Sequence, residues 1–306
     1  MKKIILLIII LIVLISCQKD NNVPKIQIGT KALQIDFLSQ APPFEVHENE
    51  TFNIFVEIKN IGTQNIDELQ DSKGLLVVDV DDQYVRIKKE INPFFIEGKS
   101  LLNPVGGSML LQKKATAKAL PIQQERMNTK IIIGTCFKYS TNAGIDVCID
   151  TIPEKLGKKV CTAQTKSIFG GQGAPVAITR IESKMLPSWD DKKTIPEFTI
   201  YLQNLGGGEI INKDKILLAC DNNERNLIER KDFDLIDVKV SLPQQGELTC
   251  NNPSLSLQLN DRKVVCKYDT DGGIPKTKGV FLSSLAINIK YGYFQTAVKP
   301  ITISKV

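Results

Sequence analysis

The chain has 306 residues, a mass of 34.0 kDa and a formal net charge of +5. Apolar residues make up 42% and charged residues 24%, a globular composition that excludes wholesale disorder. Only six of the 39 basic residues are Arg and there is a single His, which argues against Arg-based nucleic-acid recognition, His-rich metal sites and most His-based catalysis.

The N-terminus has the pattern of a secretory signal. Met1-Lys2-Lys3 precedes an apolar run from Ile4 to Ile15, which as a helix would reach about 18 Å, short of the roughly 30 Å bilayer core. The following Ser16-Cys17 resembles the end of the lipobox of prokaryotic lipoproteins, in which the Cys is acylated. We expect a signal peptide over residues 1–16, lipidation of Cys17 and a tether over residues 17–24. An uncleaved anchor with a free Cys17 is the alternative.

The rest of the chain alternates in the manner of β-strands. Apolar and polar residues alternate over Phe52–Asn60, Leu255–Leu259 and Ala297–Ile303, and Gly-, Asn- and Pro-rich turns separate such runs. No long amphipathic helix is apparent, and the Lys-rich segment Lys113–Lys118 is typical of an exposed sheet edge, where Lys opposes unwanted pairing. The pattern predicts an all-β protein of the sandwich class.

The two halves of the chain repeat each other. A strand ending in Asn60-Ile61-Gly62 has a counterpart ending in Asn204-Leu205-Gly206, and Ile131–Tyr139 parallels the strand that begins at Leu285. We therefore predict two tandem immunoglobulin-like β-sandwiches, over residues 25–167 and 176–306, joined by a Gly-rich linker over residues 168–175.

The strand–Asn–x–Gly element, opening after a charged turn, resembles the CARDB/NEW3-type immunoglobulin-like modules of prokaryotic, archaeal-like surface lipoproteins. The stretch from Cys136 to Cys148, followed by Gly170–Pro175, is similar to repeated ectodomains of archaeal envelope proteins. This resemblance implies an immunoglobulin-like fold, a location on the cell surface and a role in adhesion or envelope assembly. It implies no catalytic residue.

Six cysteines remain once Cys17 is set aside, an even number that suggests three disulfides in an extracytoplasmic protein. We favour the local pairs Cys148–Cys161 and Cys250–Cys266. Cys136 and Cys220 then either bridge the halves or stay as buried thiols. No C-x-x-C spacing supports a zinc or redox role.

Two acidic turns could supply oxygen ligands to Ca²⁺, namely Asp79–Asp82 and the pair Asp269 and Asp271. Local hydrogen bonding within turns explains both equally well, and we expect no cofactor. The Gly-rich stretches at 170–173 and 206–208 lack the Lys-Ser/Thr and helix of a phosphate loop, so no nucleotide is expected.

Trp189 and His47 are the remaining candidates for a site. A core position near a strand start is our interpretation of Trp189, and an exposed aromatic that contacts a glycan or protein is the alternative. His47 has no nucleophile in a recognisable elbow and is interpreted as an exposed loop residue.

Taken together, these features predict a membrane-anchored, extracytoplasmic, non-catalytic binding or structural protein, with a protein or glycan partner at the cell surface and no nucleic acid. An accessory subunit of an envelope enzyme, secretion or transport complex is the alternative.

Overall fold

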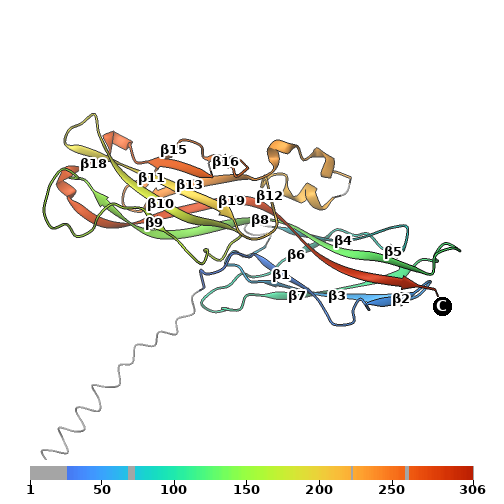
Figure 1. Cartoon of the computed structure of the whole chain (residues 1–306). Coiled ribbons are helices and arrows are strands. Elements are labelled where there is room, and N and C mark those ends of the chain that lie inside the picture. The colour runs from blue at the N-terminus through green and yellow to red at the C-terminus, as the bar shows by residue number, and fades with distance from the viewer. Residues whose placement is uncertain (1–25, 68–72, 222, 259–261, 306) are drawn as a thin grey trace, which may run out of the picture.

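A computed structural model describes residues 26–67, 73–221, 223–258 and 262–305 (Figure 1). These residues form strands and five short 3₁₀ helices without any α-helix, which confirms the all-β prediction. Within them no helix is long and apolar enough to span a bilayer. The predicted signal peptide, Cys17 and the tether lie outside the described residues.

Sheet I takes all its strands from the first half of the chain, and sheet II takes its strands from the second half except for the two-residue strand β9. Sheet I has the order β1 (Leu33–Phe37), β3 (Thr51–Asn60), β7 (Ser108–Ala117), β5 (Val85–Ile87). Sheet II has the order β15 (Thr249–Cys250), β17 (Lys263–Lys267), β11 (Lys193–Asn204), β10 (Val176–Pro187), β9 (Lys166–Ser167), and β18 (Ile274–Pro275) also pairs with β11. Alternate residues of β3 are buried, as its apolar–polar alternation predicts.

The third sheet, called the shared sheet here, takes strands from both halves. Its order is β14 (Gly246–Glu247), β13 (Leu235–Leu242), β19 (Val280–Ser304), β8 (Arg126–Asp150), β4 (Gly74–Val80), β6 (Asn92–Phe94). β12 (Glu209–Ile211) and β2 (Glu45–His47) also pair with β19, and β16 (Ser254–Ser256) pairs with β13. The 3₁₀ helices are η1 (Ile216–Cys220), η2 (Arg225–Leu227), η3 (Arg230–Asp232), η4 (Thr270–Gly272) and η5 (Lys276–Lys278).

Two strands of 25 residues each run through the whole molecule. β8 and β19 pair antiparallel along their full length, from Arg126 opposite Ser304 to Asp150 opposite Val280. At about 3.3 Å per residue this pair is roughly 80 Å long. Since β8 and β19 are equivalent strands of the two repeats, the pairing relates the halves by an approximate two-fold axis near Lys138 and Gly292, which lie opposite each other.

Each half of the long pair faces a different sheet (Figure 1). In the C-terminal half of β19, Gln295 donates a hydrogen bond to the carbonyl of Leu33 in sheet I. At the equivalent position of β8, Thr141 donates to the carbonyl of Val176 in sheet II. The shared sheet therefore runs across the predicted boundary between residues 25–167 and 176–306, and each half contributes a strand to the sandwich of the other.

The repeated Asn–x–Gly motif anchors the loops that meet the long pair. Asn60 accepts from the amide of Gly62 and donates to the carbonyl of Gln64, and the amide of Gln64 donates to the Tyr139 hydroxyl at 3.3 Å. The second copy repeats all three hydrogen bonds with Asn204, Gly206, Gly208 and Tyr293. The motif is thus a docking site for a buried tyrosine of the shared sheet.

These tyrosines belong to an aromatic cluster at the centre of the molecule. Neighbouring ring centroids lie 5.6–6.3 Å apart, mostly edge to face. The members are Phe94, Phe137, Tyr139, Tyr291 and Tyr293. Burial raises the pKa of Tyr139 and of Tyr291, and raises that of Tyr293 to about 12, so the hydroxyls stay neutral partners of the surrounding backbone at physiological pH.

The segment 168–175, predicted as a linker, is packed into the fold. Gln172 is buried and its amide group bonds both the N–H and the carbonyl of Ile178. Gly171 has a φ of +69°, and a side chain there would meet the carbonyl of Gly29 at 2.3 Å. The Gly-rich composition therefore serves a tight turn against the N-terminal segment, which a sequence pattern cannot distinguish from a flexible joint.

We expect residues 25–167 not to fold alone, because β8 would lose β19 along its whole length and β2 would lose its neighbour. The full chain should give one cooperative urea transition by far-UV circular dichroism, with the fluorescence of Trp189 following the same transition, and the fragment should give no cooperative transition by circular dichroism. Two separate transitions of the full chain, or a cooperative transition of the fragment, would contradict the shared sheet.

Gly62→Ala should lower the free energy of unfolding by about 1–3 kcal/mol, because the new methyl group would lie 2.0 Å from the Tyr139 hydroxyl. Urea unfolding measures the loss. Gly144→Ala is the control, since its methyl would meet only the Ser284 hydroxyl, at 3.2 Å. Adding Tyr139→Phe should restore part of the loss, because the carbonyl of Gly173 remains at 2.8 Å. An unchanged free energy of unfolding in Gly62→Ala would contradict the role of the Asn–x–Gly motif as a docking site for Tyr139.

Candidate functional site

Three disulfides join the six cysteines outside the N-terminal segment. Cys148–Cys161 and Cys250–Cys266 are the local pairs favoured from the sequence, and Cys136–Cys220 bridges the two halves, one of the two alternatives for that pair. Such bonds form and persist in oxidising compartments, so they indicate an extracytoplasmic protein.

Cys136–Cys220 fastens a helical insertion, residues 212–234 with η1, η2 and η3, onto the outer face of the shared sheet. Beside it lies an open groove of about 640 Å³, lined in part by Val77, Ile132, Phe294 and Val298. Lys89 at its rim pairs with Asp82 at 2.5 Å and lies 3.8 Å from Asp79. The groove thus combines an apolar floor with charged side chains, of which more are acidic than basic: Asp79, Glu90, Glu209 and Asp221 against Lys89 and Arg225.

The predicted metal ligands are engaged in local contacts. Asp269 accepts from the Thr249 hydroxyl at 3.0 Å and pairs with Lys267 at 3.3 Å, while Asp271 occupies a left-handed turn position with φ +50°. Among the described residues, no three His, Cys, Asp or Glu side chains converge as metal ligands do. His47 lies exposed at the end of β2, with its Nδ1 3.2 Å from the Ser304 hydroxyl.

The core interpretation of Trp189 is wrong, since its side chain is 82% exposed. Trp189 follows Pro187, the last residue of β10, in the short turn to β11, and so lies beyond the end of the sheet. The ring lies against Gly272, where φ is +81° and an added Cβ would come within 3.0 Å of the indole. Ser188 fixes the turn by donating to the carbonyl of Gly272 at 2.6 Å. The indole is therefore held on one side and open to solvent.

Three loops meet at this end of the molecule, and we call them the tip: residues 151–165, 188–192 and 269–279. The register brings them together, since Asp150 of β8 lies opposite Val280 of β19, and Thr194 of β11 opposite Ile274 of β18. Thr194 donates to the carbonyl of Thr151 at 2.8 Å, and Lys276 donates to Glu154 at 3.1 Å. Loops on a rigid sandwich end are a common place for binding residues.

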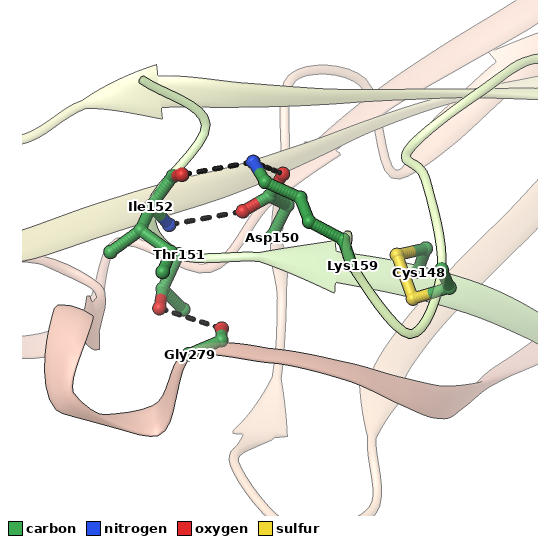
Figure 2. Close-up of a disulfide and its surroundings, with 7 residues drawn as sticks. Cys148, Asp150, Thr151, Ile152, Lys159 and Gly279 are labelled. Carbon is green, nitrogen blue, oxygen red and sulfur yellow. Dashed lines mark hydrogen bonds and ion pairs between the residues drawn. A yellow bond between two sulfur atoms is a disulfide. The ribbon is translucent and has the colours of Figure 1, made fainter. Parts of the chain in front are cut away.

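The longest tip loop is tied down at both ends (Figure 2). Cys148–Cys161 closes it over a separation of 13 residues, and the ammonium of Lys159 donates to Asp150 at 2.6 Å and to the carbonyl of Ile152 at 3.0 Å. Thr151 donates to the carbonyl of Gly279 at 2.8 Å. The fixed ends hold exposed Leu156 and Val160 on the same tip as Trp189.

Sequence reasoning named Trp189 and the cysteines but missed the assembly of the tip. Asp150, Lys159 and Thr194 carry no motif, and only the strand register brings them together. The short separation of Cys148 and Cys161 was the one signal in the sequence that could have marked this loop as closed.

No family model matches the chain, and no curated protein matches it. Among solved structures, the C-terminal domain of the antigen I/II-family protein AspA of Streptococcus pyogenes is 6% identical, with a TM-score of 0.19, over 90% of this chain and 100% of that one. The C-terminal domain of the Streptococcus agalactiae AgI/II polypeptide BspA is 7% identical, with a TM-score of 0.18, over 89% and 98%.

Replacing Cys148 and Cys161 by Ser should loosen the tip loop selectively. Closing a loop of this length stabilises a fold by about 3 kcal/mol in the chain-entropy picture. We expect a lower free energy of unfolding, and faster amide hydrogen exchange over residues 151–161 by a larger factor than at the centre of β8 and β19, where exchange follows global unfolding alone. Ser at Cys250 and Cys266 is the control and should leave the tip amides as they are. Unchanged exchange over residues 151–161 in the first variant would contradict the role of Cys148–Cys161 in holding this loop.

Proposed function

We propose that this is a membrane-anchored, non-catalytic protein of the cell envelope that presents the tip to a protein or glycan at the cell surface. The observation that carries the proposal is Trp189, a solvent-exposed indole supported by the Gly272 turn at the end of a rigid sandwich. Exposed, immobilised aromatic side chains bind with little loss of conformational entropy, and they dominate many interfaces.

The entry point of the chain supports a presenting role. Gly29 bonds Gly170 and Gly173, and Gly173 bonds Thr63 beside the aromatic cluster, so the chain enters near the middle of the molecule. From Lys138 at the centre, β8 extends about 40 Å to the tip. A chain anchored through lipid on Cys17, with residues 18–24 as a tether, would hold the tip away from the membrane. Stable anchoring needs more than one acyl chain.

Protein extracted from membranes as the full chain tests both the lipid anchor and the binding through the tip. We expect it to lack residues 1–16 and to carry acyl mass on Cys17, and Cys17→Ser should move it to the soluble fraction. We expect it to bind cells of the producing organism, with periodate-sensitive binding indicating a glycan and protease-sensitive binding a protein. Trp189→Ala should weaken binding by about tenfold or more, as expected for an aromatic anchor.

Phe169→Ala is the matched control, because Phe169 is also an exposed aromatic, at 88%, but lies at the packed joint between the halves. It should bind as the unchanged chain does. Equal binding by Trp189→Ala would refute the tip as the binding site, and an unprocessed N-terminus would refute the anchor independently.

A further inference from the structure

Sheet I has an open edge along most of β7. β7 pairs with β3 from Ser108 to Thr116, but its other neighbour, β5, covers only Ala115, Thr116 and Ala117. The seven residues Ser108–Lys114 thus have a strand on one side only.

The register shows which backbone groups face this edge. The amide of Asn60 donates to the carbonyl of Gly107, and that of Ala117 to the carbonyl of Glu50, so odd-numbered residues of β7 bond to β3. The N–H and C=O groups of Ser108, Leu110, Gln112 and Lys114 point the other way. No backbone hydrogen bond joins these four to another described residue. They offer a ladder of alternating donors and acceptors to an incoming strand.

Exposed apolar side chains are concentrated in β7 and in the segment that precedes it in the chain. Of the 18 large hydrophobic residues exposed in the described part of the chain, six lie between positions 91 and 110. They are Ile91, Phe95, Leu101, Leu102, Val105 and Leu110. Lys113 of β7 donates to Glu90 at 2.8 Å and to Asn92 at 3.3 Å, which places the segment with Ile91 directly beneath the edge. Leu102 is 98% exposed in the loop that leads into β7.

We propose that the open edge of β7 binds an extended strand of another protein, which adds to sheet I by β-augmentation. Backbone groups at Ser108, Leu110 and Gln112 supply the ladder, and the rim of Ile91 and Phe95 takes up apolar side chains at alternate positions of the partner. Lys114 is exposed and lies at one end of the ladder, so an acidic residue opposite it completes the match.

Charge disfavours a second copy of this chain as the occupant. Two such edges would each bring Lys113 and Lys114, and each chain carries a net charge of +5. Lys at a strand edge is a common device against self-pairing. The exposed edge predicted at Lys113–Lys118 agrees with this arrangement. Lysines lie at one end of β7 and oppose self-pairing there, while Ser108–Gln112 carries no charge.

A library of displayed seven-residue peptides, screened against the full chain, tests the proposal. We expect enriched peptides to alternate apolar and polar residues and to end in an acid. On adding such a peptide, amide exchange at Leu110 and Gln112 should slow by about tenfold or more, as new backbone hydrogen bonds form. Exchange at Leu111, which is bonded to β3, should not change. A lack of enrichment, or no slowing at Leu110 and Gln112, would overturn the proposal.

Leu110→Pro is the informative variant, because its N–H points away from β3 and Pro is tolerated at such edge positions. It should keep the unfolding midpoint and lose peptide binding by about tenfold or more, since one backbone donor is gone and the ring blocks the ladder. Leu110→Thr keeps the backbone and should still bind. If Leu110→Pro is unfolded, the amide exchange of the unchanged chain decides alone.

Two further outcomes would also overturn the proposal. Equal binding by folded Leu110→Pro would place the peptide elsewhere, and a dimer in sedimentation that Leu110→Pro dissociates would identify a second copy as the occupant. The edge lies in sheet I and the tip at the end of sheet II, so Trp189→Ala leaves this test unaffected and Leu110→Pro leaves the test of the tip unaffected.

Discussion

The continuous pairing of β8 with β19 is the interaction on which the rest of the structure depends. Each strand is half in one sandwich and half in the other, so neither half of the chain can complete its core without the other. The pairing also fixes the orientation of the two sandwiches relative to each other, because one antiparallel ladder runs through both. A flexible joint between separate modules would leave that angle free.

The centre of the ladder explains the repeated motif. Where β8 and β19 cross from one sandwich to the other, their buried aromatic rings pack together, and two of the tyrosines need partners for their hydroxyl groups. The loops after Asn60 and Asn204 provide these partners with the same set of hydrogen bonds. Glycine is required at position 62 because the tyrosine hydroxyl occupies the space of a side chain. The motif thus has the same packing role in both halves of the chain.

A rigid double sandwich also sets where contacts with other molecules can occur. One face of each sheet packs into the core, and the insertion held by Cys136–Cys220 covers part of the outer face of the shared sheet. The ends and the strand edges remain accessible, and they differ in character. The tip presents an indole held by short loops, whereas β7 presents backbone groups beside apolar side chains. Each suits a different partner, one recognised through side chains and one through an extended main chain.

Local patterns in the sequence determined the strand content, the internal repeat and the local cysteine pairs, because alternation, turn residues and short separations act within a few positions of the chain. The exchange of strands between the halves was not predictable, since the pattern of β8 is the same whether its partner lies in its own half or the other. Trp189 illustrates the same limit: a Trp after Pro near a strand is compatible with a core or a loop position. Only the tertiary structure decided that β10 ends at Pro187 and leaves the Trp189 side chain exposed. Burial depends on where distant segments lie, and a sequence pattern does not record their positions.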